Sequence, residues 1–91
     1  MIKGVNAKEL TIIKNILKNY DAKFFAYGSR VKGNYSDLSD LDILVKSDKN
    51  IIPELKEQFD KSYIPYVVNF TDANSIDEKF YNLIKNDLIE I

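Results

Sequence analysis

The most constraining feature of this 91-residue chain is a Gly-Ser pair separated by ten residues from two aspartates that lead into an apolar run. The pair is Gly28 and Ser29, the aspartates are Asp40 and Asp42, and the run covers residues 43–45. Aspartates two residues apart on a strand project to the same face, because strand side chains alternate. A glycine at a strand-to-helix turn lets the backbone approach a phosphate, which the helix start also favours. The pattern therefore predicts an α/β fold with a phosphate-binding turn beside paired carboxylates.

Glycine, serine and aspartate are also ordinary turn residues, so either half of this pattern alone would fit a plain loop. A loop does not explain Asp40 and Asp42 inside an apolar strand, where unpaired ionised carboxylates are costly. A divalent cation removes that cost, and Mg²⁺ prefers carboxylate and phosphate oxygens. We therefore expect Asp40 and Asp42 to bind metal, and Gly28 and Ser29 to bind the phosphates of a nucleotide.

The composition narrows the chemistry further. The chain has no cysteine and no histidine, which excludes thiol nucleophiles, thiolate zinc sites and imidazole bases. Its net charge of −1 and its 45% apolar content suit a single globular domain over residues 1–91 without the basic field of a strong nucleic-acid binder. No apolar stretch approaches the ~20 residues that span a bilayer. We expect a cytoplasmic protein with no membrane association.

Periodicity and capping residues predict the remaining elements. Asn6 with Glu9, and Ser75 with Glu78, have the spacing of capping boxes at the first and last helices. The last helix is expected to turn Phe80, Leu83 and Ile84 inward. Helices are predicted over residues 7–20, from Ser29, over 53–61 and over 75–85, with strands over 23–27, 40–45, 63–70 and 88–91.

Residues 25–33 and 39–45 resemble the minimal nucleotidyltransferases of the DNA polymerase β superfamily, and the order of predicted elements extends the resemblance to the whole chain. The resemblance implies a polymerase β-like fold, a small mixed sheet flanked by helices. It also implies nucleotidyl transfer from ATP with two Mg²⁺ ions held by three carboxylates. Two of these are Asp40 and Asp42, and the third position, on the neighbouring strand, is Asn69. An amide is a weaker ligand and cannot act as a general base.

Asn69 leaves several explanations open. The third carboxylate could be Asp72, although an offset of three residues places it on the opposite strand face. The chain could also be a natural pseudoenzyme, or Asn69 could be an Asp→Asn substitution that disables the base and preserves the fold. The predicted catalytic set is therefore Asp40, Asp42 and Asn69, with activity in question at Asn69.

Other polar and aromatic residues near the motif have weaker signals. We expect Arg30 to contact a phosphate or a partner, and Lys32 to be a solvated charge. Asp37 fits a turn. Strand aromatic residues could stack on a base, although they more often pack in a sheet; they are Tyr27, Tyr66 and Phe70.

The resemblance also implies a partner. Stand-alone proteins of this kind are typically antitoxins of a HEPN-domain RNase toxin, and they transfer AMP from ATP to a tyrosine of that toxin. The alternative is a catalytically inactive protein that neutralises its partner by binding, for which Asn69 is the best support. Transfer to a small molecule such as an aminoglycoside is less favoured, because we expect no substrate-binding domain after the core.

Overall fold

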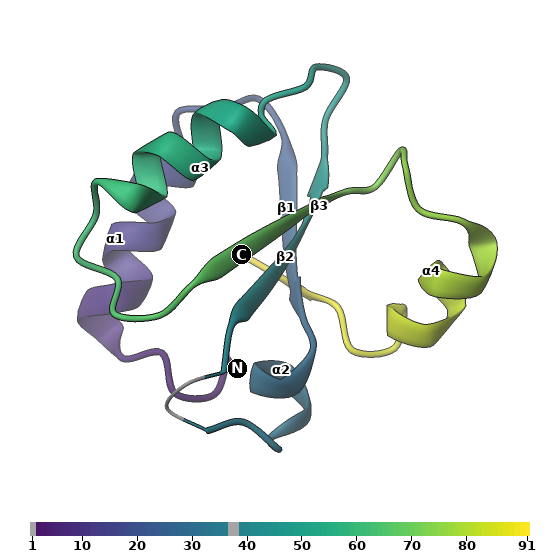
Figure 1. The fold of residues 1–91 in the computed structure, drawn as a ribbon, viewed down its shortest axis with the longest axis horizontal. Helices are drawn as coiled ribbons and strands as arrows, with labels where there is room; N and C mark the ends of the chain where they lie inside the picture. The colour runs from purple at the N-terminus through teal and green to yellow at the C-terminus, as the bar shows by residue number, and fades with distance from the viewer. Residues whose placement is uncertain (1, 37–38) are drawn as a thin grey trace.

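The computed structural model describes residues 2–36 and 39–91 and contains one mixed sheet flanked by helices (Figure 1). The strands are β1 Lys23–Tyr27, β2 Leu41–Lys46, β3 Val68–Asp72 and β4 Ile89–Glu90, in the order β3-β2-β1-β4. β2 is parallel to β3 and antiparallel to β1, which also pairs antiparallel with β4. This arrangement confirms the predicted α/β class and the small mixed sheet.

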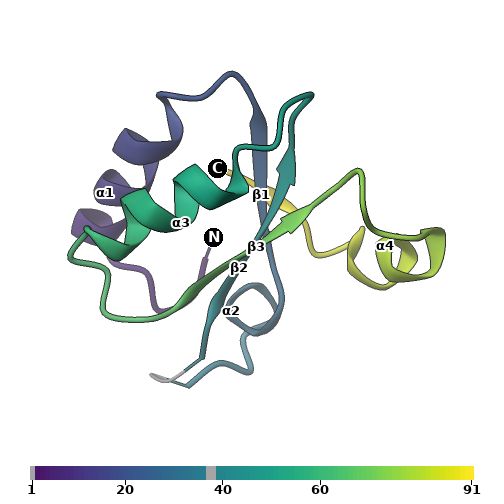
Figure 2. The ribbon, with the colours of Figure 1, turned by 45° about the horizontal axis from the view of Figure 1, so that its top comes forward.

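Two helices, α1 Ala7–Leu17 and α3 Ile52–Asp60, lie together on one face of the sheet (Figures 1 and 2). The main core fills the space beneath them, because alternate residues of β1 and β2 point to that face. The largest fully buried apolar side chains of this core are Ile13, Leu41, Ile43 and Leu55. Asn6 and Glu9 form the predicted capping box of α1, with Glu9 N donating to Asn6 Oδ1 over 2.7 Å.

The opposite face is covered more thinly. It carries α4 Glu78–Ile84 and a smaller buried cluster of Tyr27, Leu44 and Ile84. Figure 2 shows α4 on the far side of the sheet from α1 and α3. A single helical turn, α2 Ser29–Lys32, follows β1 directly. No helix of residues 2–36 and 39–91 is long and apolar enough to cross a membrane.

Several sequence-based boundaries were wrong, and Asp40, predicted as the first residue of the second strand, lies just before β2. α1 ends at Leu17, not at residue 20. The predicted strand over residues 63–70 begins only at Val68 and runs on to Asp72; Pro65 lacks an N–H donor, so it does not suit a sheet ladder. Asp37, expected in a turn, lies outside the described residues.

The start of the last helix also differs from the prediction. Asp77, not Ser75, caps α4, because its side chain accepts a hydrogen bond from Phe80 N over 2.7 Å. Ser75 belongs to the preceding turn, where its N–H donates to the Asp72 carbonyl. Leu83, expected to face inward, is 67% exposed, whereas Ile84 is buried.

Candidate active site

The two aspartates of the motif converge on one amide. Asp42 of β2 is paired in register with Asn69 of β3, while Asp40 lies one residue before β2 begins. Asn69 Nδ2 donates to Asp40 Oδ2 over 2.8 Å and to Asp42 Oδ1 over 3.3 Å. Since one nitrogen atom reaches both carboxylates, Asp40 and Asp42 lie on the same face of the sheet, together with Asn69.

The glycine of the motif passes directly beside one of these carboxylates. Gly28 follows β1 with a φ of 89°, and a Cβ atom built on it would lie 2.5 Å from Asp42 Oδ2. Any side chain here would meet both backbone strain and this collision. The Gly28 carbonyl accepts hydrogen bonds from the N–H groups of Val31 and Lys32, which fixes α2 immediately after Gly28. The turn and the carboxylates therefore form one small site.

Burial raises the pKa of Asp42 above its ordinary value; the hydrogen bond from Asn69 lowers it, and the nearby charge of Asp40 raises it. A cation beside the two carboxylates would offset both the loss of solvation and their mutual repulsion. This environment favours a positively charged ligand at the site.

The oxygen donors present fit Mg²⁺. Asp40 and Asp42 can each give a carboxylate oxygen, and Asn69 can give its amide oxygen if the amide rotates, with water completing the shell. In residues 2–36 and 39–91, no group of three acidic, histidine or cysteine side chains surrounds a possible metal position. The site thus has one negative charge fewer than a three-carboxylate centre.

Comparison with known proteins agrees with this geometry. Residues 10–91 match the family model described as a nucleotidyltransferase domain. The chain belongs to this family. It is 33% identical to "Probable protein adenylyltransferase MntA" of Haemophilus influenzae (strain ATCC 51907 / DSM 11121 / KW20 / Rd), over an alignment covering 96% of this chain and 82% of the relative. These similarities identify the protein as a minimal nucleotidyltransferase and confirm the transferase class expected from the motif.

Arg30, which was expected to contact a phosphate or a partner, lies in the interior beside this candidate site. Its residue surface is only 2% exposed. Its guanidinium donates to the main-chain carbonyls of Ser39 and Lys3 and lies over the rings of Tyr66 and Tyr35. The side chain is therefore occupied internally, and the geometry gives it no open face for a phosphate. Sequence reasoning missed this role because its partners lie far apart in the chain.

Asp72, the alternative third carboxylate, is also remote from the pair. It is aligned with Val45 at the far end of β2, three positions beyond Asn69. Its carboxylate accepts hydrogen bonds from Asn74 N at 2.9 Å and from Ser75 Oγ at 3.3 Å. Asp72 therefore organises the turn after β3, and Asn69 is the β3 residue that meets Asp40 and Asp42.

The other residues singled out in the sequence have internal or surface positions. Tyr27 bonds the Thr71 hydroxyl at 2.9 Å, and Phe70 packs edge-to-face on Phe59. Burial and the charge of Glu9 raise the pKa of Tyr66 to about 12, so its hydroxyl stays protonated beside Glu9. Tyr27 is buried, whereas Tyr66 is only half-buried and lines a cavity beside Asp40. Lys32 is a surface residue near Asp87, at 3.6 Å.

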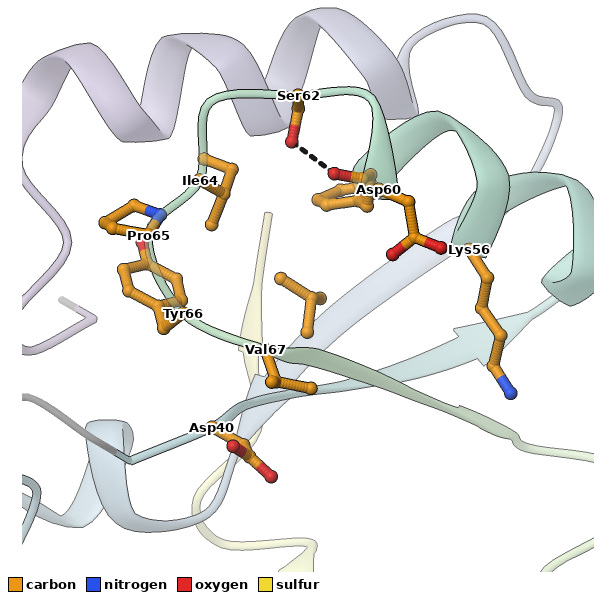
Figure 3. A pocket seen from close by; sticks show the side chains of 10 residues that line it. Asp40, Lys56, Asp60, Ser62, Ile64, Pro65, Tyr66 and Val67 are labelled. Atoms are coloured by element: carbon orange, nitrogen blue, oxygen red, sulfur yellow. Dashed lines mark hydrogen bonds between the residues drawn. The ribbon is translucent and has the colours of Figure 1, made fainter.

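A cavity that the sequence did not predict adjoins Asp40. Figure 3 shows its lining, which combines residues of α3 with the segment that leads into β3. Its volume is about 460 Å³, within the range of small-molecule sites. Lys56 and Asp60 contribute charges from α3, while Ile64, Pro65 and Val67 contribute apolar surface. The candidate metal ligand Asp40 thus lies beside a recess with both charged and apolar walls.

Proposed function

We propose that this protein transfers AMP from ATP to a tyrosine of a partner HEPN-domain RNase toxin, and that it acts in the cytoplasm as the antitoxin of that toxin. The observation that carries the proposal is the contact of the Asn69 amide with Asp40 and Asp42, beside the Gly28 turn. The similarity to a probable protein adenylyltransferase supports a protein as the acceptor.

Each part of the site has a role in this reaction. The N–H groups of the turn at Gly28 and Ser29 would bind the ATP phosphates. Asp40 and Asp42, with the Asn69 amide, would hold Mg²⁺, which when bound helps to ionise the attacking hydroxyl and to neutralise the leaving group. Transfer forms a bond between the tyrosine oxygen and the α-phosphorus of ATP and breaks the bond to pyrophosphate. The tyrosine proton leaves to the site or to solvent.

The direct test is incorporation of label from α-³²P-ATP into a HEPN-domain toxin supplied as the acceptor. We expect labelled toxin with wild-type protein and Mg²⁺, and no labelling with Asp42→Asn or after replacement of the acceptor tyrosines by phenylalanine. Labelling that persists in Asp42→Asn would remove the proposed site from the reaction.

A second candidate function is neutralisation of the toxin by binding alone. Asn69 favours it, because a neutral amide in place of a third carboxylate weakens both metal binding and proton removal. Inhibition of the toxin RNase at equimolar antitoxin, without ATP and without any covalent modification, would support this alternative. A requirement for ATP would support transfer instead.

A further inference from the structure

Asp40 lies outside the strand ladder, so its position depends on the residues on either side of it. On one side, Leu41 N donates to the Val67 carbonyl over 2.9 Å. On the other side, the Ser39 carbonyl accepts two hydrogen bonds from a single guanidinium, from Arg30 Nε at 3.1 Å and from Arg30 Nη2 at 2.9 Å. The main chain that carries Asp40 is thus anchored by Val67, the residue directly before β3, and by Arg30.

The guanidinium of Arg30 is held from several directions. Its Nη1 donates to the Lys3 carbonyl over 3.2 Å, and Lys3 N donates back to the Arg30 carbonyl over 2.7 Å. Its central carbon lies 4.1 Å from the ring centroid of Tyr66 and 5.4 Å from that of Tyr35. Within the described part of the chain, no carboxylate lies within ion-pair distance of it. A buried charge held only by carbonyls and rings is costly, which indicates a specific use.

We infer that Arg30 is a positioning residue that sets Asp40 relative to the phosphate-binding turn. Arg30 directly follows Ser29 in α2, and its side chain grips the carbonyl directly before Asp40. One residue therefore links the turn at Gly28 and Ser29 to the candidate metal ligand. The inference rests on the proposed nucleotide and metal site, and it assigns Arg30 no contact with the substrate.

Arginine suits this task better than lysine. The planar guanidinium reaches the Ser39 and Lys3 carbonyls with three N–H groups, whereas a lysine side chain ends in a single nitrogen. Arg30→Lys keeps the positive charge but loses the set of guanidinium N–H donors that reaches both carbonyls. The turn at Gly28 and Ser29 and the ligand Asp40 would then no longer be held in fixed relative positions, although both would still be present.

The test measures how much Mg²⁺ strengthens nucleotide binding. Affinity for an ATP analogue with a non-hydrolysable α–β linkage is measured by calorimetry, with Mg²⁺ and with EDTA. We expect the gain from Mg²⁺ to fall roughly tenfold to a hundredfold in Arg30→Lys, a typical cost of losing a residue that orients a metal ligand. The affinity in EDTA should stay as in wild type. A general structural defect would lower both affinities together.

A second variant disturbs Arg30 without replacing it. Gly4 has a φ of 72°, and a Cβ atom there would collide with Arg30 Nη1 and the Tyr35 ring. Gly33 has a φ of 94°, and a Cβ atom there would meet nothing within 4 Å. Gly4→Ala and Gly33→Ala therefore introduce comparable backbone strain, but only Gly4→Ala presses on the guanidinium. We expect only Gly4→Ala to reduce the gain from Mg²⁺.

The outcomes separate this inference from the proposed function. If wild-type protein shows no gain from Mg²⁺, the nucleotide and metal site itself is wrong. If wild type shows the gain and both Arg30→Lys and Gly4→Ala retain it in full, Arg30 does not position Asp40. If Arg30→Lys fails to fold, Gly4→Ala against Gly33→Ala decides the question alone.

Discussion

At the scale of single residues, Asn69 is the neutral side chain that contacts both carboxylates of the candidate site, so a change of its charge tests that site directly. Its amide nitrogen lies 2.8 Å from Asp40 Oδ2 and 3.3 Å from Asp42 Oδ1. Asn69→Asp would replace these hydrogen bonds with the repulsion of a third carboxylate, which a bound cation would relieve. If the slot is the missing third carboxylate, AMP transfer to a tyrosine acceptor should rise by roughly 10²–10⁴-fold, the usual contribution of a general base.

This prediction is checked by the transfer rate of Asn69→Asp with saturating Mg·ATP and the cognate acceptor. Asn69→Ser is the control, because it also removes the amide but adds no carboxylate, so its rate should not rise. An unchanged rate in Asn69→Asp would contradict the assignment of this slot. Partner affinity should change little in either variant.

The raised pKa of Asp42 predicts how stability without metal depends on pH. Burial raises the pKa in the folded protein, so the folded state holds this proton more tightly than the unfolded state does. The stabilisation from the protonated form is therefore complete below the unfolded pKa and is lost as pH rises through the folded pKa. Asp42→Asn should consequently be more stable than wild type at pH 7 in EDTA, and the difference should shrink at acidic pH.

Chemical denaturation at several pH values checks this prediction. Asp72→Asn is a useful comparison, because that carboxylate lies in a turn and away from the pair. A wild-type protein that is more stable than Asp42→Asn at pH 7 without metal would contradict the account of this carboxylate.

The sequence predicted some residues well and others poorly, for a physical reason. Asp40 and Asp42 could be placed on one face because strand side chains alternate, and the resemblance to the nucleotidyltransferases pointed to Asn69, which is in register with Asp42 on the neighbouring strand. Arg30 could not be placed, because its side chain contacts Lys3, Ser39 and Tyr66, which only the tertiary fold brings together. A basic residue after a phosphate-type turn looks the same in sequence whether it faces solvent or the interior.

At the scale of helices and strands, elements marked by a single strong local pattern were predicted correctly. A helix start with two candidate capping residues was not. The strand over residues 23–27 and the cap of α1 by Asn6 were confirmed, because each depends on a short local pattern. The start of α4 was misplaced because Ser75 and Asp77 are both good capping residues. The turn after β3 uses Ser75, which leaves Asp77 to cap the helix.

The capping assignment gives a prediction about stability. Asp77→Ala should lower the free energy of unfolding by about 1 kcal/mol, because the Phe80 N–H loses its partner and the N-terminus of the helix loses a negative charge. Glu78→Ala is the matched control, since it removes an acidic residue from the same turn but no cap. Urea denaturation of the two variants would measure the difference, and equal losses would contradict the assignment.

At the scale of the whole molecule, one face of the sheet holds the main core and the other carries the candidate site. The face under α1 and α3 holds the main core, so it supplies most of the apolar burial. The face with α4 has a small buried cluster and carries Asp42 and Asn69. The length and apolar content of the chain predicted a single modest core, but the uneven division between the faces required the structure. A well-packed layer thus supports a more open one that bears the candidate site.

The central claim is that Asp40 and Asp42 bind Mg²⁺ together with ATP, and the stabilisation of the protein by Mg·ATP tests it most directly. At a hundredfold excess over the dissociation constant, ligand binding should stabilise wild type by about 2.7 kcal/mol. Asp72→Ala, a loss of the same residue type outside the site, should keep this effect. The account predicts no stabilisation in Asp40→Ala/Asp42→Ala, and equal stabilisation of that variant and wild type would contradict it.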